Sequence, residues 1–480
     1  TLFLQTKPWE WMSLTLDSCV FTVEGQKLTA TFELAAGEIK GIYGPSGSGK
    51  STLFRLLAGL SEEGFESGCY KIDEQDFTEL SPTQRIAFVS LMFQNPDTQF
   101  CMRTPREELL FCLENMAIPL EEMTNRVTQA LDFCEIRHLE HRVLTTLSGG
   151  EKQLVALACC LVLESRYLLL DEPFANLDPM TTRSILKKLT EIQQQKEIGI
   201  LLIDHQVAPV ADWVQEWLVL PDAFQPISSG QLLEQEERLR QTLTRSPRPP
   251  KQQPLLRFVD FRLPIGDHSL VIENETFYAG ELIGITGKSG LGKSTFFKAL
   301  LQQASYDGSV YYQEQCLTSR SRPFEKMSWI MQNPQDQFLA SSVAQELANG
   351  QEKSDLSEKL NQLGLWGKRE DSPFLLSQGQ QRRLAVACLI DREIPILLVD
   401  EPTYGQDLRQ SWQLMSLLAD KAASGTLVFI ISHELRILSD FCDRTVDFNL
   451  YVKEAFDEAP KPNRQTANFI RAGIARLFSK

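Results

Sequence analysis

The chain has 480 residues and a formal net charge of −15. This length predicts two to four domains, each large enough to bury its own core. The negative charge disfavours sequence-independent binding to the backbone of nucleic acids, and no apolar run reaches the length of a membrane span. The ten cysteines contain no C-x-x-C pair, so we expect buried, reduced thiols and no metal or redox site.

The first 43 residues predict short β segments, at 14–23 and 27–34, followed by an apolar strand at 39–43. The next stretch, GPSGSGKST, fits the pattern G-x-x-x-x-G-K-[ST] that cradles nucleotide phosphates. Its glycines let backbone N–H groups close around phosphate oxygens, and the following helix points its positive dipole end at them. The expected phosphate-binding residues are Gly44, Pro45, Ser46, Gly47, Ser48, Gly49, Lys50, Ser51 and Thr52.

Further along the first half, residues 86–93 predict a buried strand that ends at Gln94. Residues 105–146 are rich in Glu, Leu and Arg at helical spacing and predict a small helical subdomain. LSGGE follows at 147–151 and leads into an Ala/Leu/Cys-rich helix. Two apolar strands complete this half, at 167–170 before an Asp-Glu pair and at 198–203 before an Asp-His pair.

The same order of motifs recurs in the second half, which indicates a duplicated domain. The two loop lysines, Lys50 and Lys293, are 243 positions apart, and the two Asp-Glu pairs are 229 positions apart. Because the second offset is smaller, the second half must be shorter than the first between the phosphate loop and the signature, a region where insertions are tolerated. The second loop, GKSGLGKST, follows an apolar strand at 282–285 and contains Gly287, Lys288, Ser289, Gly290, Leu291, Gly292, Lys293, Ser294 and Thr295.

The two loops predict two nucleoside triphosphate sites. Lys50 and Lys293 would reach the β- and γ-phosphates, and the hydroxyls of Ser51 and Ser294 would hold Mg²⁺. Residues 238–254 are rich in proline and basic residues and predict a short extended linker, so the halves must lie side by side. The expected division is a first domain at 1–237, this linker, a second domain at 255–455 and a tail at 456–480.

A phosphate loop, a Gln loop, LSGGE, a strand ending in Asp-Glu and a late His, in that order, resemble the ATPase domain of ABC proteins. The likeness covers nearly the whole chain, twice. It implies an α/β fold of two tandem P-loop (RecA-like) ABC ATPase domains, each with a small antiparallel β subdomain and an α-helical subdomain. The stretches FQNPDTQF, MQNPQDQFL, LLSQGQQRRLAVA and DEPTYGQD also resemble the ATPases of energy-coupling factor (ECF) transporters.

The resemblance implies a role for the acidic pairs. Asp171 and Asp400 would hold the Mg²⁺ shell, and Glu172 and Glu401 would polarise the water that attacks the γ-phosphorus. On its own, an acidic pair after a strand is also compatible with a helix N-cap.

The resemblance also implies that Gln94 and Gln332 contact Mg²⁺ or water and report nucleotide occupancy. His205 and His433 follow apolar strands at matching positions of the repeat and should reach the γ-phosphate. Because both sites keep a carboxylate and a histidine, we predict that both hydrolyse ATP.

LSGGE and its second copy LSQGQ resemble the ABC signature, which acts in trans on the nucleotide of the opposite domain. Without the resemblance, each would be only a helix start. Site one would pair Lys50, Gln94, Glu172 and His205 with the second signature, and site two would pair Lys293, Gln332, Glu401 and His433 with the first. The signature residues are Ser148, Gly149, Gly150, Ser377, Gln378 and Gly379, with Gln378 in place of the usual glycine. The loops at 175–178 and 404–407 would carry signals between the halves, and Gln406 replaces the common leucine there.

The aromatic residue that normally stacks on adenine in this family is missing. Val23 and Leu263 stand near those positions, while Phe21 or Phe261 would either substitute or belong to the core. Preference for ATP therefore follows from the resemblance alone.

The resemblance implies an ATPase with ATP and Mg²⁺ as cofactors that works as an intramolecular pseudo-dimer. In the ECF group the partners are a transmembrane coupling subunit and a substrate-binding membrane subunit that import vitamins or metal ions. This would place the chain at the cytoplasmic face of the cell membrane, as a peripheral protein that binds no nucleic acid. The basic stretch at 464–480 would touch lipid or a partner, or pack as a helix on the second domain.

The competing class is a soluble tandem ATPase acting on ribosomes or nucleic acid. Tandem translation factors carry a long charged helical linker, whereas this linker is short and proline-rich. Chromosome and repair ATPases insert coiled coils or zinc modules, whereas only 54 positions separate Gln94 from Ser148. Co-purification with membranes or with ribosomes would separate the two classes.

Overall fold

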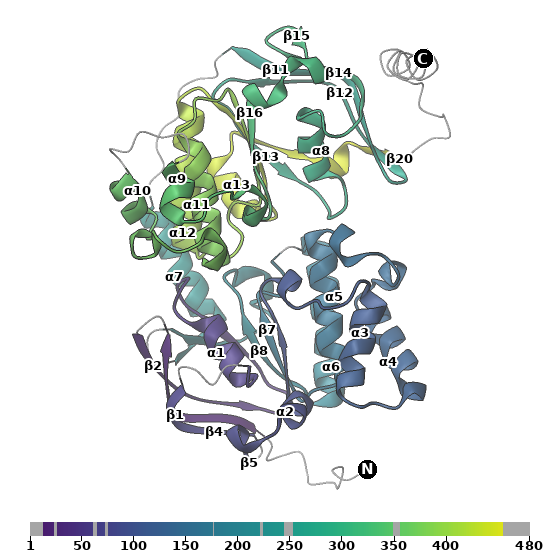
Figure 1. Cartoon of the computed structure of the whole chain (residues 1–480), viewed down its shortest axis with the longest axis vertical. Helices are drawn as coiled ribbons and strands as arrows, with labels where there is room; N and C mark the ends of the chain where they lie inside the picture. Colours follow the sequence, from purple (N-terminus) through teal and green to yellow (C-terminus); the bar gives the residue numbers. More distant parts are fainter. Residues whose placement is uncertain are drawn as a thin grey trace, which may run out of the picture. The chain divides into compact units, whose positions relative to one another are not determined.

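The structure is a computed structural model of the whole chain, and it describes residues 13–23, 26–60, 65–72, 75–175, 177–220, 224–243, 253–348 and 356–454. The chain forms two compact units (Figure 1). Unit 1 comprises Thr1–Thr244 together with two short segments from the second half of the sequence, Leu376–Gln380 and Thr403–Gln413. Unit 2 comprises Arg245–Leu375, Gln381–Pro402 and Leu414–Lys480.

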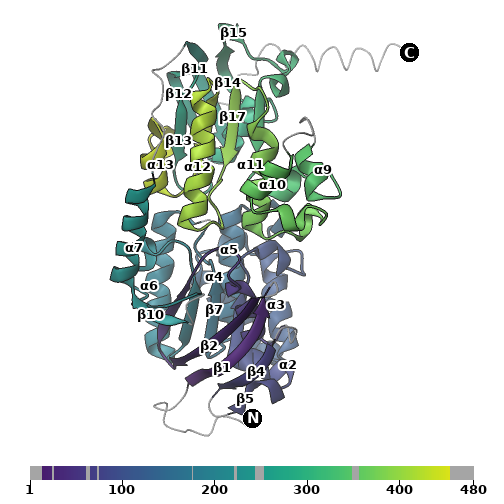
Figure 2. The same ribbon diagram turned by 90° about the vertical axis from the view of Figure 1, so that its left-hand side faces the viewer.

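Unit 1 begins with a four-stranded antiparallel sheet in the order β2-β1-β4-β5 (Figure 2). A bulge in β1 after Leu16 puts Ser18 at a φ of 52°, so that Leu16 and Cys19, three positions apart, both face the core. Gly68 on β4 permits this bulge, because a Cβ there would lie 2.4 Å from the Cα of Cys19. The strands are β1 (Ser13–Val23), β2 (Gln26–Ala35), β4 (Phe65–Ile72) and β5 (Gln75–Asp76).

The central sheet of unit 1 has six strands in the order β10-β9-β3-β8-β7-β6, all parallel except β10. Strands β7 and β8 are buried on both faces, as expected of a parallel sheet covered on both sides. Leu169 packs toward α1 and the antiparallel sheet, and Leu168 packs toward the helices on the other face. The strands are β3 (Ile39–Tyr43), β6 (Val89–Met92), β7 (Tyr167–Asp171), β8 (Gly199–Ile203), β9 (Glu216–Val219) and β10 (Gln225–Ser228).

The helices of unit 1 begin at side-chain caps that the sequence supplies. Thr104 and Ser148 form capping boxes with glutamates three residues later, and Asp178 caps α6. Helices α3, α4 and α5 pack together as the helical subdomain (Figure 1). The helices are α1 (Lys50–Leu57), α2 (Pro82–Phe88), α3 (Pro105–Asn115), α4 (Leu120–Phe133), α5 (Gly149–Val162), α6 (Pro179–Lys196) and α7 (Ser229–Thr242).

The antiparallel sheet of unit 2 repeats the plan of the first, in the order β15-β14-β11-β12-β20. The bulge recurs too: Asp260 has a φ of 49°, and a Cβ on Gly308 would lie 2.1 Å from its carbonyl oxygen. The aromatic rings of Phe258, Phe261 and Phe296 pack edge-on or stacked beneath this sheet. The strands are β11 (Pro254–Ile265), β12 (His268–Tyr278), β14 (Asp307–Tyr312), β15 (Gln315–Cys316) and β20 (Val452–Glu454).

The second sheet of unit 2 is wholly parallel, in the order β16-β17-β18-β13-β19. Its strands are β13 (Leu282–Thr286), β16 (Met327–Ile330), β17 (Ile396–Asp400), β18 (Leu427–Ile431) and β19 (Arg444–Asp447). The helices are α8 (Lys293–Leu300), α9 (Val343–Ala348), α10 (Leu356–Gln362), α11 (Gln378–Ile390), α12 (Leu408–Ala423) and α13 (Leu435–Phe441). Helices α11 and α12 begin in the two segments that group with unit 1. The predicted duplication of an α/β domain with a small antiparallel sheet is confirmed.

Three local predictions are wrong. Residues 86–88 are helical because they form the last turn of α2. This helix begins at Pro82, after a capping box on Ser81, and β6 begins only at Val89. Residues 238–242 of the predicted linker continue α7. All ten cysteines are free thiols, but Cys101 and Cys316 are exposed. The remainder of the linker at 244–252 and the tail at 456–480 lie outside the described residues.

Candidate functional site

Each phosphate loop connects the carboxyl end of a parallel strand to a short helix. In unit 1 the loop follows β3, and Gly49, at a φ of 91°, precedes the first residue of α1. In unit 2 the loop follows β13, and Gly292, at a φ of 76°, precedes α8. These left-handed conformations favour glycine and turn successive N–H groups toward one point. Both loops therefore have the local geometry of an anion cradle.

The loop lysines lie folded over their own loops. Lys50 Nζ donates to the carbonyl oxygens of Gly44 and Pro45, both at 2.8 Å. Lys293 Nζ donates to the carbonyl of Gly287 at 2.8 Å and to that of Lys288 at 3.0 Å. Burial lowers the pKa of Lys50, and the carboxylates of the neighbouring Asp-Glu pair act against that shift. Each ammonium group thus lies against the carbonyl oxygens of the loop that we predict to bind phosphate.

The two strand-end aspartates fit a Mg²⁺ site. Asp171 and Asp400 are buried and hydrogen-bond to Ser51 and Ser294, respectively. In each, one carboxylate oxygen is buried and has no hydrogen-bond partner within the described part of the chain. Burial raises the pKa of Asp171 to about 7 and that of Asp400 to about 6. A buried carboxylate with an unpaired oxygen beside a serine hydroxyl is a donor set suited to Mg²⁺.

The two following glutamates share a backbone conformation that is rare for residues other than glycine. Glu172 has a φ of 49° and Glu401 a φ of 48°. The N–H of Glu172 donates to the carbonyl of Ile203 at 2.8 Å, and that of Glu401 donates to Ile431 at 2.9 Å. The neighbouring strand thus holds both residues in this conformation. Strained backbone of this kind clusters at functional sites, and the sequence alone did not predict it.

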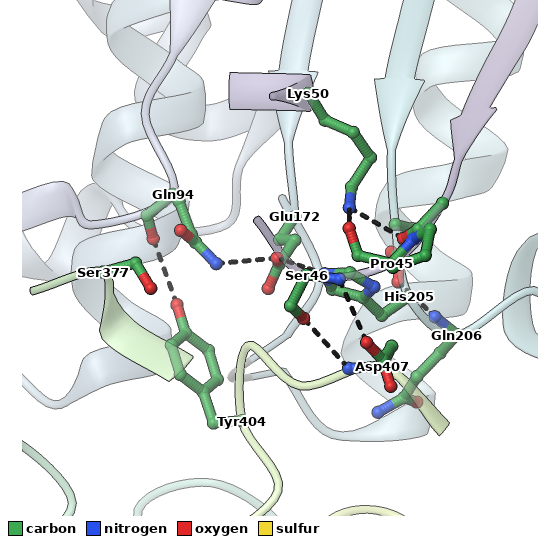
Figure 3. Close-up of polar contacts among 12 residues, drawn as sticks. Pro45, Ser46, Lys50, Gln94, Glu172, His205, Gln206, Ser377, Tyr404 and Asp407 are labelled. Atoms are coloured by element: carbon green, nitrogen blue, oxygen red, sulfur yellow. Dashed lines mark hydrogen bonds and ion pairs between the residues drawn. The ribbon is translucent and has the colours of Figure 1, made fainter. Parts of the chain in front are cut away.

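The side chains of Gln94 and His205 converge on Glu172 (Figure 3). Gln94 Nε2 donates to Glu172 Oε1 at 2.6 Å, and His205 Nε2 lies 3.3 Å from the same oxygen. Burial by itself would raise the pKa of Glu172, but His205, Gln94 and Lys50 together bring it below its ordinary value. The predicted catalytic group of the first half is therefore assembled in unit 1.

In unit 2, His433 Nε2 lies 3.5 Å from Glu401 Oε1. Burial raises the pKa of Glu401 to about 7, against the opposing charge of Lys293. Gln332 follows β16 and is half-buried. A histidine thus lies beside the second glutamate as beside the first, but here burial outweighs the neighbouring groups that lower its pKa.

Both signature serines cap their helices. The N–H of Glu151 donates to Ser148 Oγ at 3.3 Å, and the N–H of Gln380 donates to Ser377 Oγ at 3.4 Å. Both signature sequences therefore do form the start of a helix. Gly149 and Gly150 form the first turn of α5, and Gln378 and Gly379 that of α11. The action of either signature on a nucleotide in trans stays a prediction.

Unit 1 brings the loop at 403–407 against its own phosphate loop (Figure 3). The N–H of Ser46 donates to Asp407 Oδ2 at 3.0 Å, and the N–H of Asp407 donates to Ser46 Oγ at 3.3 Å. Gln406 Nε2 donates to the carbonyl of Gly379 at 2.9 Å, which gives the unusual glutamine a partner in the signature. All the residues predicted for site one lie in unit 1: Lys50, Gln94, Glu172, His205, Ser377 and Gly379. The pairings predicted for site one and for site two both stay predictions.

Two buried polar residues that the sequence reasoning missed support the acidic pairs. Gln153 on α5 donates from Nε2 to the carbonyl of Glu172 at 2.6 Å. At the matching position of α11, Arg382 Nη1 donates to the carbonyls of Met331 at 3.0 Å and Asp400 at 3.2 Å. Their common offset of 229 positions within an apolar helix was the available signal.

The structure decides between the two roles left open for Phe21 and Phe261, and both belong to the core. Phe21, Phe261 and Leu263 are fully buried in the cores beneath the antiparallel sheets, so their side chains are not exposed to stack on a base. Ile265, at the end of β11, is half-buried, and a Cβ on Gly292 would lie 2.3 Å from its Cδ1. Ile265 is therefore an apolar residue next to the second phosphate loop, and Phe448 is another, 3.1 Å from a Cβ on Gly287. The side chain of Val23 lies outside the described ones.

Two parallel-sheet domains, each with a phosphate loop, a buried Asp-Glu pair and a capped signature helix, define a tandem P-loop ATPase. The sequence profile of the ABC transporter family matches residues 29–175 and again residues 273–404. The chain belongs to this family, with two fused ABC ATPase domains.

Similar proteins cover most of the chain. It is 32% identical over 483 residues to "Putative HMP/thiamine import ATP-binding protein YkoD" of Bacillus subtilis (strain 168), with 90% of this chain and 88% of the relative covered. It is 29% identical over 473 residues to a "Putative ABC transporter ATP-binding protein" of Streptococcus mutans serotype c, with 87% of this chain and 85% of the relative covered. These relatives support ATP binding and hydrolysis by the chain.

Solved structures of tandem ATPases share the fold. The complex of the archaeal ribosomal stalk protein aP1 with the ribosome recycling factor aABCE1 matches with a TM-score of 0.61 at 19% identity, covering 90% of this chain and 87% of that chain. Ribosome-bound archaeal Pelota and ABCE1 match with a TM-score of 0.68 at 20% identity, covering 90% and 76%. At this identity the likeness shows the fold alone. Within the described residues, no helix combines the length and the apolar character needed to cross a bilayer.

Proposed function

We propose that the chain is the ATP-hydrolysing subunit of an ECF-type importer, which powers uptake of a small nutrient through partner membrane subunits. The observation that carries this proposal is the 32% identity, across 90% of the chain, to a relative whose name describes an import ATP-binding protein. The predicted catalytic glutamate and histidine are present in both halves, which agrees with a motor that hydrolyses ATP repeatedly.

The proposed chemistry follows from the side chains at site one. ATP binding would draw Lys50 Nζ from the carbonyls of Gly44 and Pro45 to the phosphates. Ser51 and Asp171 would hold Mg²⁺, which supplies positive charge to the transferring phosphoryl group. Glu172, oriented by Gln94 and His205, would accept a proton from the attacking water.

In this proposal the two sites are composite. Ser377 and Gly379 would complete site one, and Ser148 and Gly150 would complete site two. Closure of the halves around two ATP molecules would then move the membrane partner, and release of phosphate would reopen them. Both sites would hydrolyse ATP.

The proposed partners are a transmembrane coupling subunit and a substrate-binding membrane subunit, with the chain peripheral at the cytoplasmic face. The proposed cargo class is a vitamin, a vitamin precursor or a metal ion. The name of the Bacillus relative favours a thiamine-related cargo within this class.

Fractionation tests this proposal. A tagged chain, expressed with the membrane proteins encoded beside it, should sediment with membranes and remain bound to two membrane proteins in detergent. Uptake of labelled nutrient should require ATP and should fall when Lys50 is changed to Ala, while the variant stays bound to the membrane proteins. Sedimentation with ribosomes, without any membrane partner, would identify the chain as a soluble tandem ATPase and overturn the proposal.

A further inference from the structure

We infer that Tyr404 is a positioning residue for hydrolysis at site one, where its hydroxyl fixes Gln94 and, through Gln94, the carboxylate of Glu172. Tyr404 lies on the loop at 403–407, which comes from the second half of the sequence but belongs to unit 1. The inference rests on hydrolysis at site one and is independent of cargo and membrane partner.

Two consecutive hydrogen bonds connect the loop to the catalytic carboxylate (Figure 3). The hydroxyl of Tyr404 donates to the carbonyl oxygen of Gln94 at 3.0 Å. The side-chain amide of the same glutamine donates to Glu172 Oε1 at 2.6 Å. The main chain of Gln94 is thus fixed by the tyrosine while its side chain holds the glutamate.

The residue after Tyr404 contacts the other end of Gln94. Gly405 has a φ of 69°, and a Cβ there would lie 3.2 Å from Gln94 Nε2. The loop therefore packs against both the backbone and the amide group of Gln94. A shift of this loop would therefore also displace Gln94, and with it the hydrogen bond from Gln94 to Glu172.

The same loop is tied to the phosphate loop and to the second signature. Asp407 exchanges two hydrogen bonds with Ser46, and Gln406 donates to Gly379. Tyr404 thus extends a connection that starts at the phosphate loop. A change at the phosphate loop can reach Glu172 through Asp407, Tyr404 and Gln94.

The corresponding loop of the first half, at 175–178, lacks a tyrosine hydroxyl. Ala175 stands 229 positions before Tyr404, at the same place after the Asp-Glu pair, and its side chain has no hydroxyl to donate a hydrogen bond. Site two must therefore work without an equivalent hydroxyl. The effect of Tyr404 should be confined to site one.

Steady-state ATPase kinetics with one site inactivated at a time test this inference. Glu401→Gln should leave site one active, and Glu172→Gln should leave site two active. In the Glu401→Gln background, Tyr404→Phe should lower kcat about fivefold, the effect of one net hydrogen bond, with KM unchanged. In the Glu172→Gln background, the same substitution should leave kcat unchanged.

A double-mutant cycle separates positioning from general damage. If Tyr404 acts through Gln94, then adding Tyr404→Phe to Gln94→Ala should lower kcat no further, whereas an independent structural role would lower it again. Tyr306→Phe is the matched control, because it removes a hydroxyl that is hydrogen-bonded to Gln302 at 2.8 Å outside the site.

Equal losses at both sites, or no loss at site one, would overturn the role of Tyr404. Complete loss of hydrolysis in Glu401→Gln alone would instead overturn the activity of site one, and with it this inference. The two failures are therefore distinguishable.

Discussion

The two ATPase centres of this chain share a backbone frame and differ in the side chains that support it. Glu172 and Glu401 have φ angles within one degree of each other, and each N–H donates to the last residue of the neighbouring strand. The bulges at Ser18 and Asp260 recur in the same way. Duplication has therefore preserved the features that place backbone groups.

The polar groups around the glutamates have diverged. His205 and Gln94 help to bring the pKa of Glu172 below its ordinary value despite burial, whereas burial raises the pKa of Glu401 to about 7. Gln153 supports the first acidic pair, and an arginine, Arg382, supports the second. The comparison indicates that two sites built on one frame differ in how readily their glutamates ionise.

The largest expected effect comes from removing both carboxylates that we predict to be catalytic. The double variant Glu172→Gln with Glu401→Gln should lower ATP hydrolysis about 10³-fold, the usual contribution of a general base, with ATP binding retained. Hydrolysis and equilibrium binding of ATP measure the two properties. Each single variant should keep the activity of the other site.

Turnover of the double variant near the wild-type rate would show that neither glutamate acts as the base. If only one single variant lost activity, the two centres would be unequal in chemistry as well as in pKa. That result would sharpen the comparison, because it would assign turnover to one of the two side-chain sets.

A smaller effect is expected from the buried groups behind the acidic pairs. Arg382→Ala should destabilise unit 2 by about 3 kcal/mol, because the carbonyls of Met331 and Asp400 lose a buried donor. Arg382→Gln places the residue of the first half at this position and should cost less. Thermal unfolding of the nucleotide-free protein measures both.

Gln153→Ala is the corresponding change in unit 1, and the smaller neutral side chain should cost about 1–2 kcal/mol. Equal losses for Arg382→Ala and Gln153→Ala would contradict the idea that the second acidic pair depends on a buried charge.

Sequence alone predicted what depends on short, ordered motifs. The phosphate loops, the strands before them and the Asp-Glu pairs follow from local patterns of glycine, apolar and acidic residues, and the strands and helix starts at these motifs are confirmed. The strand expected at 86–93 was wrong for its first three residues, because the capping box on Ser81 outweighed an apolar run.

The features of the fold and the site that the sequence did not predict depend on contacts between residues far apart in the chain. Gln153 and Arg382 donate to backbone carbonyls. Every residue has such a carbonyl, so the sequence does not indicate which one is the partner. The burial of Phe21 and Phe261 depends on a bulge that changes which residues face the core. Such a bulge shifts the alternation of a strand without an obvious signal in its sequence.

The smallest expected effect concerns stability and pH in the nucleotide-free protein. The pKa of Glu401, about 7, exceeds that of an unfolded glutamate, so its favourable contribution is complete below the unfolded pKa and is lost as the pH rises through 7. Glu401→Gln should therefore stabilise the protein at pH 8, on the order of 1–2 kcal/mol, and should give no gain near pH 5. Thermal unfolding across this range, without Mg²⁺, measures the difference.

Glu172→Gln should behave in the opposite way. Because the folded pKa of Glu172 is lowered, its contribution is present above the unfolded pKa and is lost only as the pH falls through the folded value. The substitution should therefore destabilise the protein at both pH 5 and pH 8. Equal shifts of the unfolding midpoint by the two substitutions at both pH values would show that the glutamates have equal environments. The divergence between the two centres would then be limited to residues that do not affect the charge of Glu172 or Glu401.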